Sequence, residues 1–347
     1  MRSSADPNKG VRAWTILLSA AFVLAGCSDR WDLGRDLEMQ TAGSGGASAE
    51  CLGDCFAGPV VQLAHAEGNA KGLVLDDTSV YWAAATAQAI VITPKGGGPS
   101  EEIQTPGAGP YRVAANATDV YFTSNVGNYV GRLDKATREI EIVLAAEPDP
   151  EVIALADDGL YFVDQSEGTL RRASFDGTSV ETLASGLFAG GDMAFDETSL
   201  YYADSGRGEI HALDRVSLQD RLLASGRAAP NSLVLRGDEL YFLELGTQDN
   251  GYADGRLARM PRDGGVIEVL LDGLDAPDGL AVDASSVFIS TRGVGMNGYR
   301  GRVVRRSDDG TTRTLADNQA EAFAIAVDDE AVYWTTDADS GLNAIRR

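Results

Sequence analysis

A ten-residue pattern of apolar strand, acidic turn and apolar strand recurs along almost the whole chain. In residues 193–202 it reads MAFDETSLYY. The first aromatic residue of the seven copies is Tyr81, Tyr121, Tyr161, Tyr201, Tyr241, Phe288 and Tyr333, so the spacings are 40, 40, 40, 40, 47 and 45 residues. A fixed period near 40 that consists only of strand-like pieces predicts the blades of a β-propeller.

Each copy is followed by two further strand-like segments. In the third unit a loop that ends in Gly168 leads to a strand over 169–172, and the turn Asp176-Gly177 leads to another over 180–183. Asp-Gly between alternating runs is a strong hairpin signal, because both residue types tolerate positive φ. Each unit is therefore predicted to be a four-stranded antiparallel blade.

The two ends of the repeat region complement each other. The last unit stops after a third strand over 342–346, whereas residues 60–64 precede the first unit like an isolated fourth strand. Pairing of these two segments would close the ring and leave no open seam. The sequence thus predicts an all-β, seven-bladed propeller over residues 59–347 with closure by the N-terminal strand; a six-bladed ring with one divergent copy is the alternative.

Residues 1–26 have the features of an export signal. Three basic residues precede an apolar run over 13–24, which is too short to span a bilayer. The run leads into LAGC, which ends at Cys27 and resembles the lipobox of bacterial lipoproteins. This resemblance implies cleavage before Cys27 and acylation of its side chain, and hence a lipid anchor in the cell envelope. Ser28 after the cysteine favours the outer over the inner membrane.

Residues 27–58 are rich in Gly, Ser and Ala and show no period, so we expect a flexible tether. Cys51 and Cys55 lie near its end, and in an oxidising compartment they are expected to form a disulfide. The chain carries 52 acidic against 29 basic residues and a net charge of −23. Such a charge disfavours nucleic acid as a partner and favours cations or basic partners. We expect a monomer that contacts the membrane through its lipid anchor alone.

Two short motifs resemble those of known propeller families. Residues 333–336, YWTT, resemble the repeats of Tyr-Trp-Thr-Asp propellers, and residues 277–280, PDGL, are similar to the openings of NHL and gluconolactonase-like repeats. Streptogramin lyases resemble the chain in their seven-bladed architecture, and that resemblance implies histidine chemistry near a metal. The sequence holds two histidines: His211 lies in a predicted third strand and His65 just after the closing strand. Each is expected to be structural or solvent-exposed rather than catalytic.

The gluconolactonase resemblance implies a divalent metal at the channel mouth. In that family Glu, Asn and Asp at the starts of inner strands hold the ion. The aligned positions in the seven units here are Lys71, Tyr111, Glu151, Gly191, Asn231, Asp278 and Phe323. The resemblance thus implies Glu151, Asn231 and Asp278 as ligands of Ca²⁺ or Mg²⁺, with a polar, water-filled mouth as the alternative.

The longer fifth and sixth units point to a working surface. Their extra residues fall in loops over 245–254 and 292–299, on the face where the inner strands start, and insertions in repeat arrays usually lie on the binding face. Acidic residues at the ends of second strands, Asp164, Asp204 and Glu244, are expected to form an acidic floor beneath these loops. The predicted binding residues are Asn231, Glu244, Tyr252, Asp278, Arg292, Tyr299 and Arg300.

No catalytic residue is assigned from the sequence. The preferred interpretation is an envelope-anchored binding scaffold for an unknown protein or small ligand. The alternative is a divalent-metal-dependent enzyme of lactonase or lyase type with its site at the channel mouth.

Overall fold

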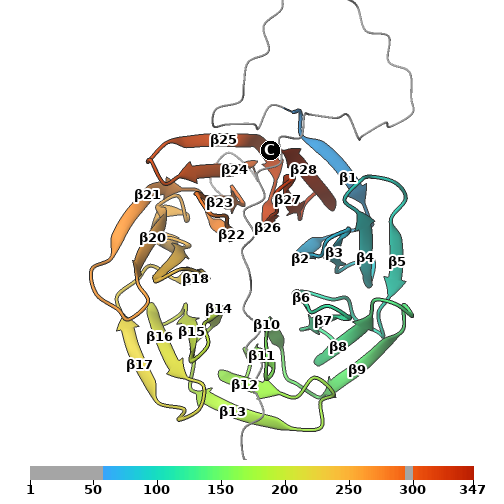
Figure 1. The fold of residues 1–347 in the computed structure, drawn as a ribbon, viewed down its shortest axis with the longest axis horizontal. Coiled ribbons are helices and arrows are strands. Elements are labelled where there is room, and N and C mark those ends of the chain that lie inside the picture. Colours follow the sequence, from blue (N-terminus) through green and yellow to red (C-terminus); the bar gives the residue numbers. More distant parts are fainter. Residues whose placement is uncertain (1–57, 294–299) are drawn as a thin grey trace, which may run out of the picture. The chain divides into compact units, whose positions relative to one another are not determined.

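Seven four-stranded antiparallel sheets are arranged as the blades of a ring (Figure 1). The structure is a computed structural model, and it describes residues 58–293 and 300–347. Seven blades confirm the fold predicted from the repeat, and the six-bladed alternative is wrong. Within the described ranges no helix is long and apolar enough to cross a membrane.

The strands follow the same order in every blade, from the centre of the ring outwards (Figure 1). The innermost strands of blades one to seven are β2 (Ala70–Leu75), β6 (Val113–Ala115), β10 (Pro150–Ala156), β14 (Gly190–Phe195), β18 (Pro230–Arg236), β22 (Pro277–Val282) and β26 (Ala322–Val327). The second strands are β3 (Ser79–Ala84), β7 (Asp119–Ser124), β11 (Gly159–Asp164), β15 (Ser199–Asp204), β19 (Glu239–Glu244), β23 (Ser286–Thr291) and β27 (Ala331–Thr336).

The third strands are β4 (Ala89–Pro94), β8 (Tyr129–Asp134), β12 (Thr169–Ala173), β16 (Glu209–Asp214), β20 (Gly255–Pro261), β24 (Arg300–Ser307) and β28 (Gly341–Arg346). The outermost strands are β5 (Glu101–Gln104), β9 (Ile140–Ala145), β13 (Val180–Ser185), β17 (Asp220–Ala224), β21 (Glu268–Leu274), β25 (Thr312–Ala320) and, in blade seven, β1 (Val61–His65). A short 3-10 helix, η1 (Gln248–Asn250), lies in the loop between β19 and β20.

The ring is closed by the first strand of the described chain. β1 pairs antiparallel with β28, with Val61 opposite Ala344 and His65 opposite Gly341. The N-terminal strand therefore completes blade seven, as the sequence predicted, although it begins one residue later than expected. Ala66, directly after β1, is buried in the apolar cluster between blades seven and one.

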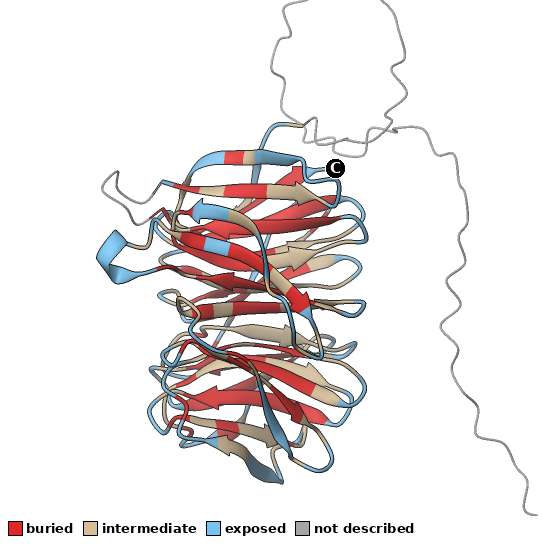
Figure 2. Cartoon of the chain, turned by 90° about the vertical axis from the view of Figure 1, so that its left-hand side faces the viewer, coloured by how far each residue is buried: buried red, intermediate tan, exposed pale blue. Residues whose placement is uncertain are grey.

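The hydrophobic core lies between the blades rather than within them. Seven buried clusters each combine residues of two neighbouring blades. Successive side chains of a strand point to opposite faces. The two consecutive large residues of each second strand therefore pack into the contacts with two different neighbouring blades, which are called junctions below. Tyr201 packs with Phe242 between blades four and five, whereas Tyr202 packs with Tyr161 between blades three and four. Figure 2 shows these buried segments running through the strands, with exposed residues mainly in the loops.

The acidic turns of the repeat link each blade to the next. In blade one, Asp76 Oδ1 accepts hydrogen bonds from the backbone N–H groups of Thr78 and Ser79, which shapes the turn between β2 and β3. The other carboxylate oxygen of Asp76 lies 3.1 Å from the Lys135 ammonium, which follows the third strand of blade two. Lys135 also lies 4.8 Å from the centre of the Tyr81 ring.

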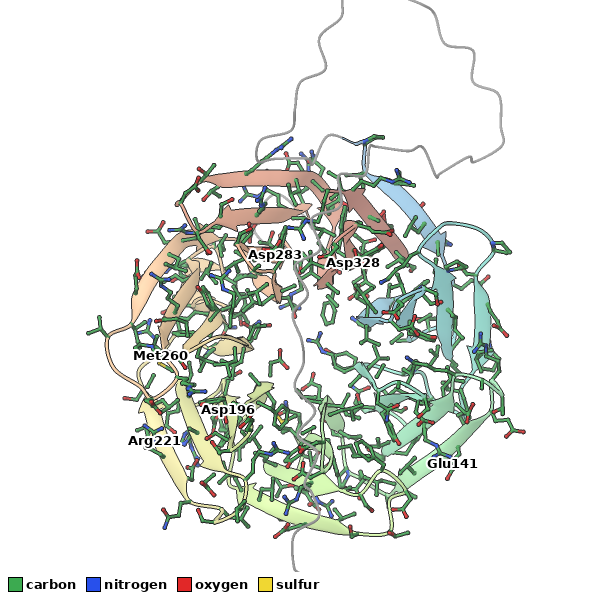
Figure 3. The ribbon with its side chains drawn as sticks, in the orientation of Figure 1. Glu141, Asp196, Arg221, Met260, Asp283 and Asp328 are labelled. Atoms are coloured by element: carbon green, nitrogen blue, oxygen red, sulfur yellow. The ribbon has the colours of Figure 1, made fainter. Side chains whose placement is uncertain are left out.

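Equivalent ion pairs join five further junctions. They are Lys95–Asp328, Arg215–Asp158, Arg262–Asp196, Arg347–Asp283 and, with the charges exchanged, Asp308–Arg236. Figure 3 shows Asp196, Asp283 and Asp328 nearer the centre of the ring than Glu141 and Arg221. Between blades two and three the same place is taken by a hydrogen bond, which the Tyr121 hydroxyl donates to the backbone carbonyl of Phe175.

Closure by β1 leads to a truncation prediction. Deletion of residues 27–66 removes β1, exposes the edge of β28 and opens the apolar cluster between blades seven and one, whereas deletion of 27–56 leaves all three in place. We expect a much lower melting temperature for the longer deletion and a nearly unchanged one for the shorter. Thermal unfolding followed by circular dichroism tests this, and equal melting temperatures would contradict closure by β1.

Candidate functional site

The seven inner strands surround a cavity of about 360 Å³ at their N-terminal ends. Each of the seven blades contributes lining residues from the start of its inner strand or from the residues just before it. The cavity therefore lies at the mouth of the central channel, on the face predicted to carry the binding site. Its position depends on the fold as a whole, because no single blade forms more than a narrow part of the wall.

The structure brings together four of the residues predicted to bind a ligand or a metal. Glu151, Asn231 and Asp278 line the cavity from blades three, five and six, and Arg292 reaches it from the loop that follows β23. Arg292 Nε lies 3.3 Å from Asp278 Oδ2, so the two form an ion pair. The predicted ring register and Arg292, the first residue of one inserted loop, thus converge on the same site.

Other predicted site residues lie elsewhere. Glu244 is 1% exposed and is ion-paired with Arg227 and Arg256 rather than lining the cavity. Tyr252 lies in the η1 loop, where its N–H donates to the carbonyl of Thr247. Arg300 begins β24 and is likewise not part of the wall. Four further predicted residues lie outside the described part of the chain: Cys27, Cys51, Cys55 and Tyr299.

The expected acidic floor needs correction, because its carboxylates are buried between loops and strands. Asp164 is fully buried and lies 3.2 Å from Arg171 Nη1. Asp204 is 2% exposed and accepts hydrogen bonds from the N–H groups of Phe188 and Arg207. Asp204 thus binds backbone N–H groups of two loops, Asp164 pairs with an arginine of β12, and neither lines the cavity.

Arg112 is the main site residue that the sequence interpretation missed. It precedes β6 in blade two, and its Nη2 donates a 3.3 Å hydrogen bond to Asp278 Oδ1 in blade six. Blades seven and one lie between these two blades, so the contact crosses the channel. Burial lowers the pKa of the Arg112 guanidinium, but the charge of Asp278, assisted by Tyr111 and Asp192, outweighs this effect and the pKa is raised.

The alignment of the repeats could have identified Arg112, because it follows Tyr111, the position that was predicted to face the channel in blade two. The residues that directly follow the seven aligned positions are Gly72, Arg112, Val152, Asp192, Ser232, Gly279 and Ala324. Two of the seven are charged, and both line the cavity. The family resemblance pointed to the residue before each of them, so neither Arg112 nor Asp192 was predicted.

Glu151 and Asp192 form an acidic side of the cavity. Burial raises the pKa of Glu151 above its usual range, against the opposing charge of Arg112. Burial also raises the pKa of Asp192, whose Oδ1 accepts a 2.9 Å hydrogen bond from the N–H of Met193. Among the described residues neither carboxylate lies within ion-pair distance of a cationic group, since Arg112 pairs with Asp278 instead.

An aromatic pair forms the part of the wall that blades two and seven contribute. Tyr111 and Phe323 meet edge to face with their ring centres 6.2 Å apart. The Arg112 guanidinium lies 4.5 Å and the Lys71 ammonium 4.8 Å from the centre of the Phe323 ring, which is the geometry of cation–π contacts. Lys71 is also ion-paired with Asp337. This side of the mouth is therefore apolar in its wall and cationic at its surface.

The described residues do not fit a divalent cation. They contain no group of three or more His, Cys, Asp or Glu side chains placed to hold a metal ion. Asp278, one of the three predicted ligands, already faces the guanidinium groups of Arg112 and Arg292, which would repel a divalent ion. The assignment of Ca²⁺ or Mg²⁺ to Glu151, Asn231 and Asp278 stays a prediction that this geometry disfavours.

Neither histidine lies in the cavity wall. His211 sits in β16, where Nδ1 is 2.9 Å from Asp220 Oδ2 and the ring stacks on Tyr202 at 4.9 Å. His65 is exposed at the end of β1. His211 thus packs and pairs within its blade, and His65 is exposed to solvent.

The fold and the site define a seven-bladed propeller with a charged ligand-sized cavity at its channel mouth, and the sequence comparison finds one similar protein of known activity. The chain is 24% identical to virginiamycin B lyase of Nocardia farcinica over 218 residues, which are 62% of this chain and 75% of that protein. No family model matches the sequence. The sequence similarity relates the chain to the streptogramin B lyase-like propellers.

Solved structures show the same architecture. Virginiamycin B lyase from Staphylococcus aureus superimposes with a TM-score of 0.70 at 15% identity, over 83% of this chain and 98% of that one. A streptogramin B lyase gives 0.69 at 16% identity over 83% and 97% of the two chains. At these identities the superpositions establish the shared fold, and they leave the function of this chain to its own residues.

The buried group of Asp164, Glu147 and Arg171 leads to a prediction about pH. Burial and the nearby charge of Glu147 raise the pKa of Asp164 to about 7, although Arg171 opposes this. The unfolded-state pKa of Asp is about 3.9, so the folded protein binds the proton more tightly. The resulting stabilisation is complete below pH 4 and is lost as the pH rises through about 7.

An Asp164→Asn variant isolates this effect, because its amide stays neutral and can still donate to Glu147. We expect the melting temperature of the variant to rise relative to that of the unmodified protein between pH 5 and pH 8. Paired melting curves across this range measure the difference. A difference that does not change with pH would show that Asp164 titrates normally.

Proposed function

We propose that this protein is an envelope-anchored binding protein whose propeller holds a small ligand in the cavity at the channel mouth. The observation that carries the proposal is the convergence of Arg112, Arg292, Glu151 and Asp192 on one cavity of about 360 Å³. This volume lies within the usual range of small-molecule sites, about 300 to 1,000 Å³. Charged groups gathered in a concave, partly desolvated site interact more strongly with a ligand than the same groups on an open surface.

Binding is favoured over catalysis by the residues available at the mouth. Among the solved relatives is a catalytically inactive histidine-to-alanine variant of virginiamycin B lyase from Staphylococcus aureus with quinupristin, so that enzyme depends on a histidine. Both histidines of this chain lie in outer parts of blades, in β1 and β16. A lyase reaction of that kind would therefore need another proton-transferring group.

A lyase-like enzyme is the second candidate. Its support is the sequence similarity to virginiamycin B lyase together with Glu151, whose raised pKa suits a general acid or base. Conversion of quinupristin, followed by liquid chromatography, tests this candidate directly. Turnover that Glu151→Gln abolishes would establish the enzyme, and a complete lack of turnover would leave the binding function.

The location of the protein is a further part of the proposal. The LAGC sequence that ends at Cys27, the tether over 27–58 and the strongly acidic composition support export and lipid anchoring in the envelope. A tether of this kind would hold a monomeric propeller at a membrane surface while leaving its channel mouth accessible. The acidic surface makes nucleic acid an improbable ligand.

The binding function predicts that filling the cavity abolishes ligand uptake. In Glu151→Trp a bulky side chain replaces a cavity-lining one, while the Glu151 backbone carbonyl still accepts its hydrogen bond from Thr123. The control is Glu102→Trp, on the exposed outer strand β5. Native mass spectrometry of the propeller with a metabolite library should give adducts with the unmodified protein and the control, and none with Glu151→Trp.

Two results would contradict the proposal. One is that no compound of the library binds the unmodified protein. The other is that every adduct persists in Glu151→Trp, which would place the binding site elsewhere.

Lipid anchoring predicts that Cys27→Ser abolishes fatty-acid labelling and releases the protein from the membrane fraction. The thiol is the acceptor of the lipid, and several acyl chains together anchor a protein stably at about 0.8 kcal/mol per buried methylene. Metabolic labelling followed by fractionation measures both effects. Undiminished labelling of the variant would refute the lipobox assignment.

A further inference from the structure

We infer that the ligand of the channel-mouth cavity is a zwitterion of amino-acid size, with an ammonium group, a carboxylate and an aromatic body. This inference rests on the proposed binding function and specifies its ligand class. Three features of the cavity wall carry it: one side holds two carboxyl groups and a buried amide oxygen without a hydrogen-bond donor, another holds two guanidinium groups, and an aromatic pair lies in the same wall.

The acceptor side is formed by blades three, four and five. Glu151 and Asp192 lack cationic partners within ion-pair distance among the described residues, as shown above. Asn231, in the next blade, donates from Nδ2 to the carbonyl of Pro277 at 3.0 Å, which fixes the orientation of its amide. Its Oδ1 is buried and has no hydrogen-bond partner. A buried acceptor without a donor is costly, and a ligand ammonium group, which carries three donors, would remove that cost.

The donor side is formed by Arg112 and Arg292. Both guanidinium groups face one carboxylate, that of Asp278, at 3.3 Å each. Arg292 Nε is buried and makes no hydrogen bond despite this proximity, and Arg112 gives Asp278 one long one. Each guanidinium carries five N–H donors, and for these two side chains the 3.3 Å bond from Arg112 to Asp278 is the one side-chain hydrogen bond made among the described residues. A ligand carboxylate is the group that matches such donors in charge and planar geometry.

The charges of the wall favour a zwitterion over a simple ion. The acceptor side carries the carboxyl groups of Glu151 and Asp192, whose ionised form a ligand ammonium group would stabilise, while Arg112, Arg292 and Asp278 leave one net positive charge on the donor side. A plain anion would be repelled by the first set, and a plain cation by the second. A molecule with both groups can satisfy both sets at once.

Size and apolar contacts restrict the body of the ligand. A cavity of about 360 Å³ is at the small end of the range for ligand sites. Tyr111 and Phe323 both line it and already form an edge-to-face pair. A ligand ring placed against this pair would gain the same kind of contact, worth about 0.5–1.5 kcal/mol for aromatic pairs.

Three matched probes test the inference by isothermal titration calorimetry. L-Phenylalanine carries both charged groups, phenethylamine lacks the carboxylate, and 3-phenylpropionate lacks the ammonium group. We expect phenylalanine to bind at least about tenfold more tightly than either analogue, because each missing group leaves charge-assisted hydrogen bonds unmade. The protein used is the propeller over residues 57–347, which retains β1.

Two conservative variants assign each half of the ligand to its side of the wall. Arg292→Gln should weaken phenylalanine binding and leave phenethylamine unchanged, whereas Glu151→Gln should weaken phenylalanine and leave 3-phenylpropionate unchanged or improved. Arg221→Gln, on the exposed outer strand β17, is the control and should bind all three probes like the unmodified protein. Unchanged melting temperatures exclude misfolding as the cause.

The inference is overturned if either analogue binds as tightly as phenylalanine, or if phenylalanine does not bind. The library experiment then distinguishes failure of the zwitterion inference from failure of the binding function. An adduct of different chemistry that Glu151→Trp abolishes would retain the binding function and refute only the zwitterion. A library without any adduct would refute both.

Discussion

The contact between neighbouring blades is the interaction on which the rest of the structure depends. Each junction buries the first aromatic residue of the repeat in one blade and, from the next blade, the residue that directly follows its own first aromatic position. All seven apolar clusters have this composition. Six junctions also contain an ion pair. It joins a residue at the turn between the first and second strands of one blade to the residue that follows the third strand of the next blade. Because a blade has no core of its own, it is stable only between two neighbours, and closure by β1 provides the last junction.

Much of the fold could be predicted from the sequence because this contact repeats. The aromatic pair and the acidic turn recur wherever a junction occurs, so their period counts the blades, and the missing fourth strand of the last unit identifies β1 as its replacement. The alignment of the repeats also placed Glu151, Asn231 and Asp278 on one ring, since equivalent positions in a closed array face the same channel. These predictions needed only local patterns and the symmetry of the fold.

The interior of the site could not be predicted in the same way. Contact between Arg112 and Asp278 depends on the diameter of the ring and on the reach of an arginine side chain, neither of which is written in a local pattern. The burial of Asp164, Asp204 and Glu244 depends on how the mouth loops fold back onto the second strands. Each of these carboxylates ends a second strand and is a buried partner of backbone N–H groups or of arginine, so the expected acidic floor is not formed.

The repeat nevertheless distinguishes positions that folding constrains from positions that it leaves variable. At the first aromatic position six copies carry tyrosine and one carries phenylalanine, because the junction needs a large flat side chain there. Two residues before each inner strand begins its apolar run, the seven copies carry seven different residues: Lys, Tyr, Glu, Gly, Asn, Asp and Phe. Six of these positions line the cavity and none belongs to the seven apolar clusters, so the core sets no common requirement on them. A charged and aromatic cavity assembled from such positions is therefore free to vary with the ligand, which is what the proposed binding function requires.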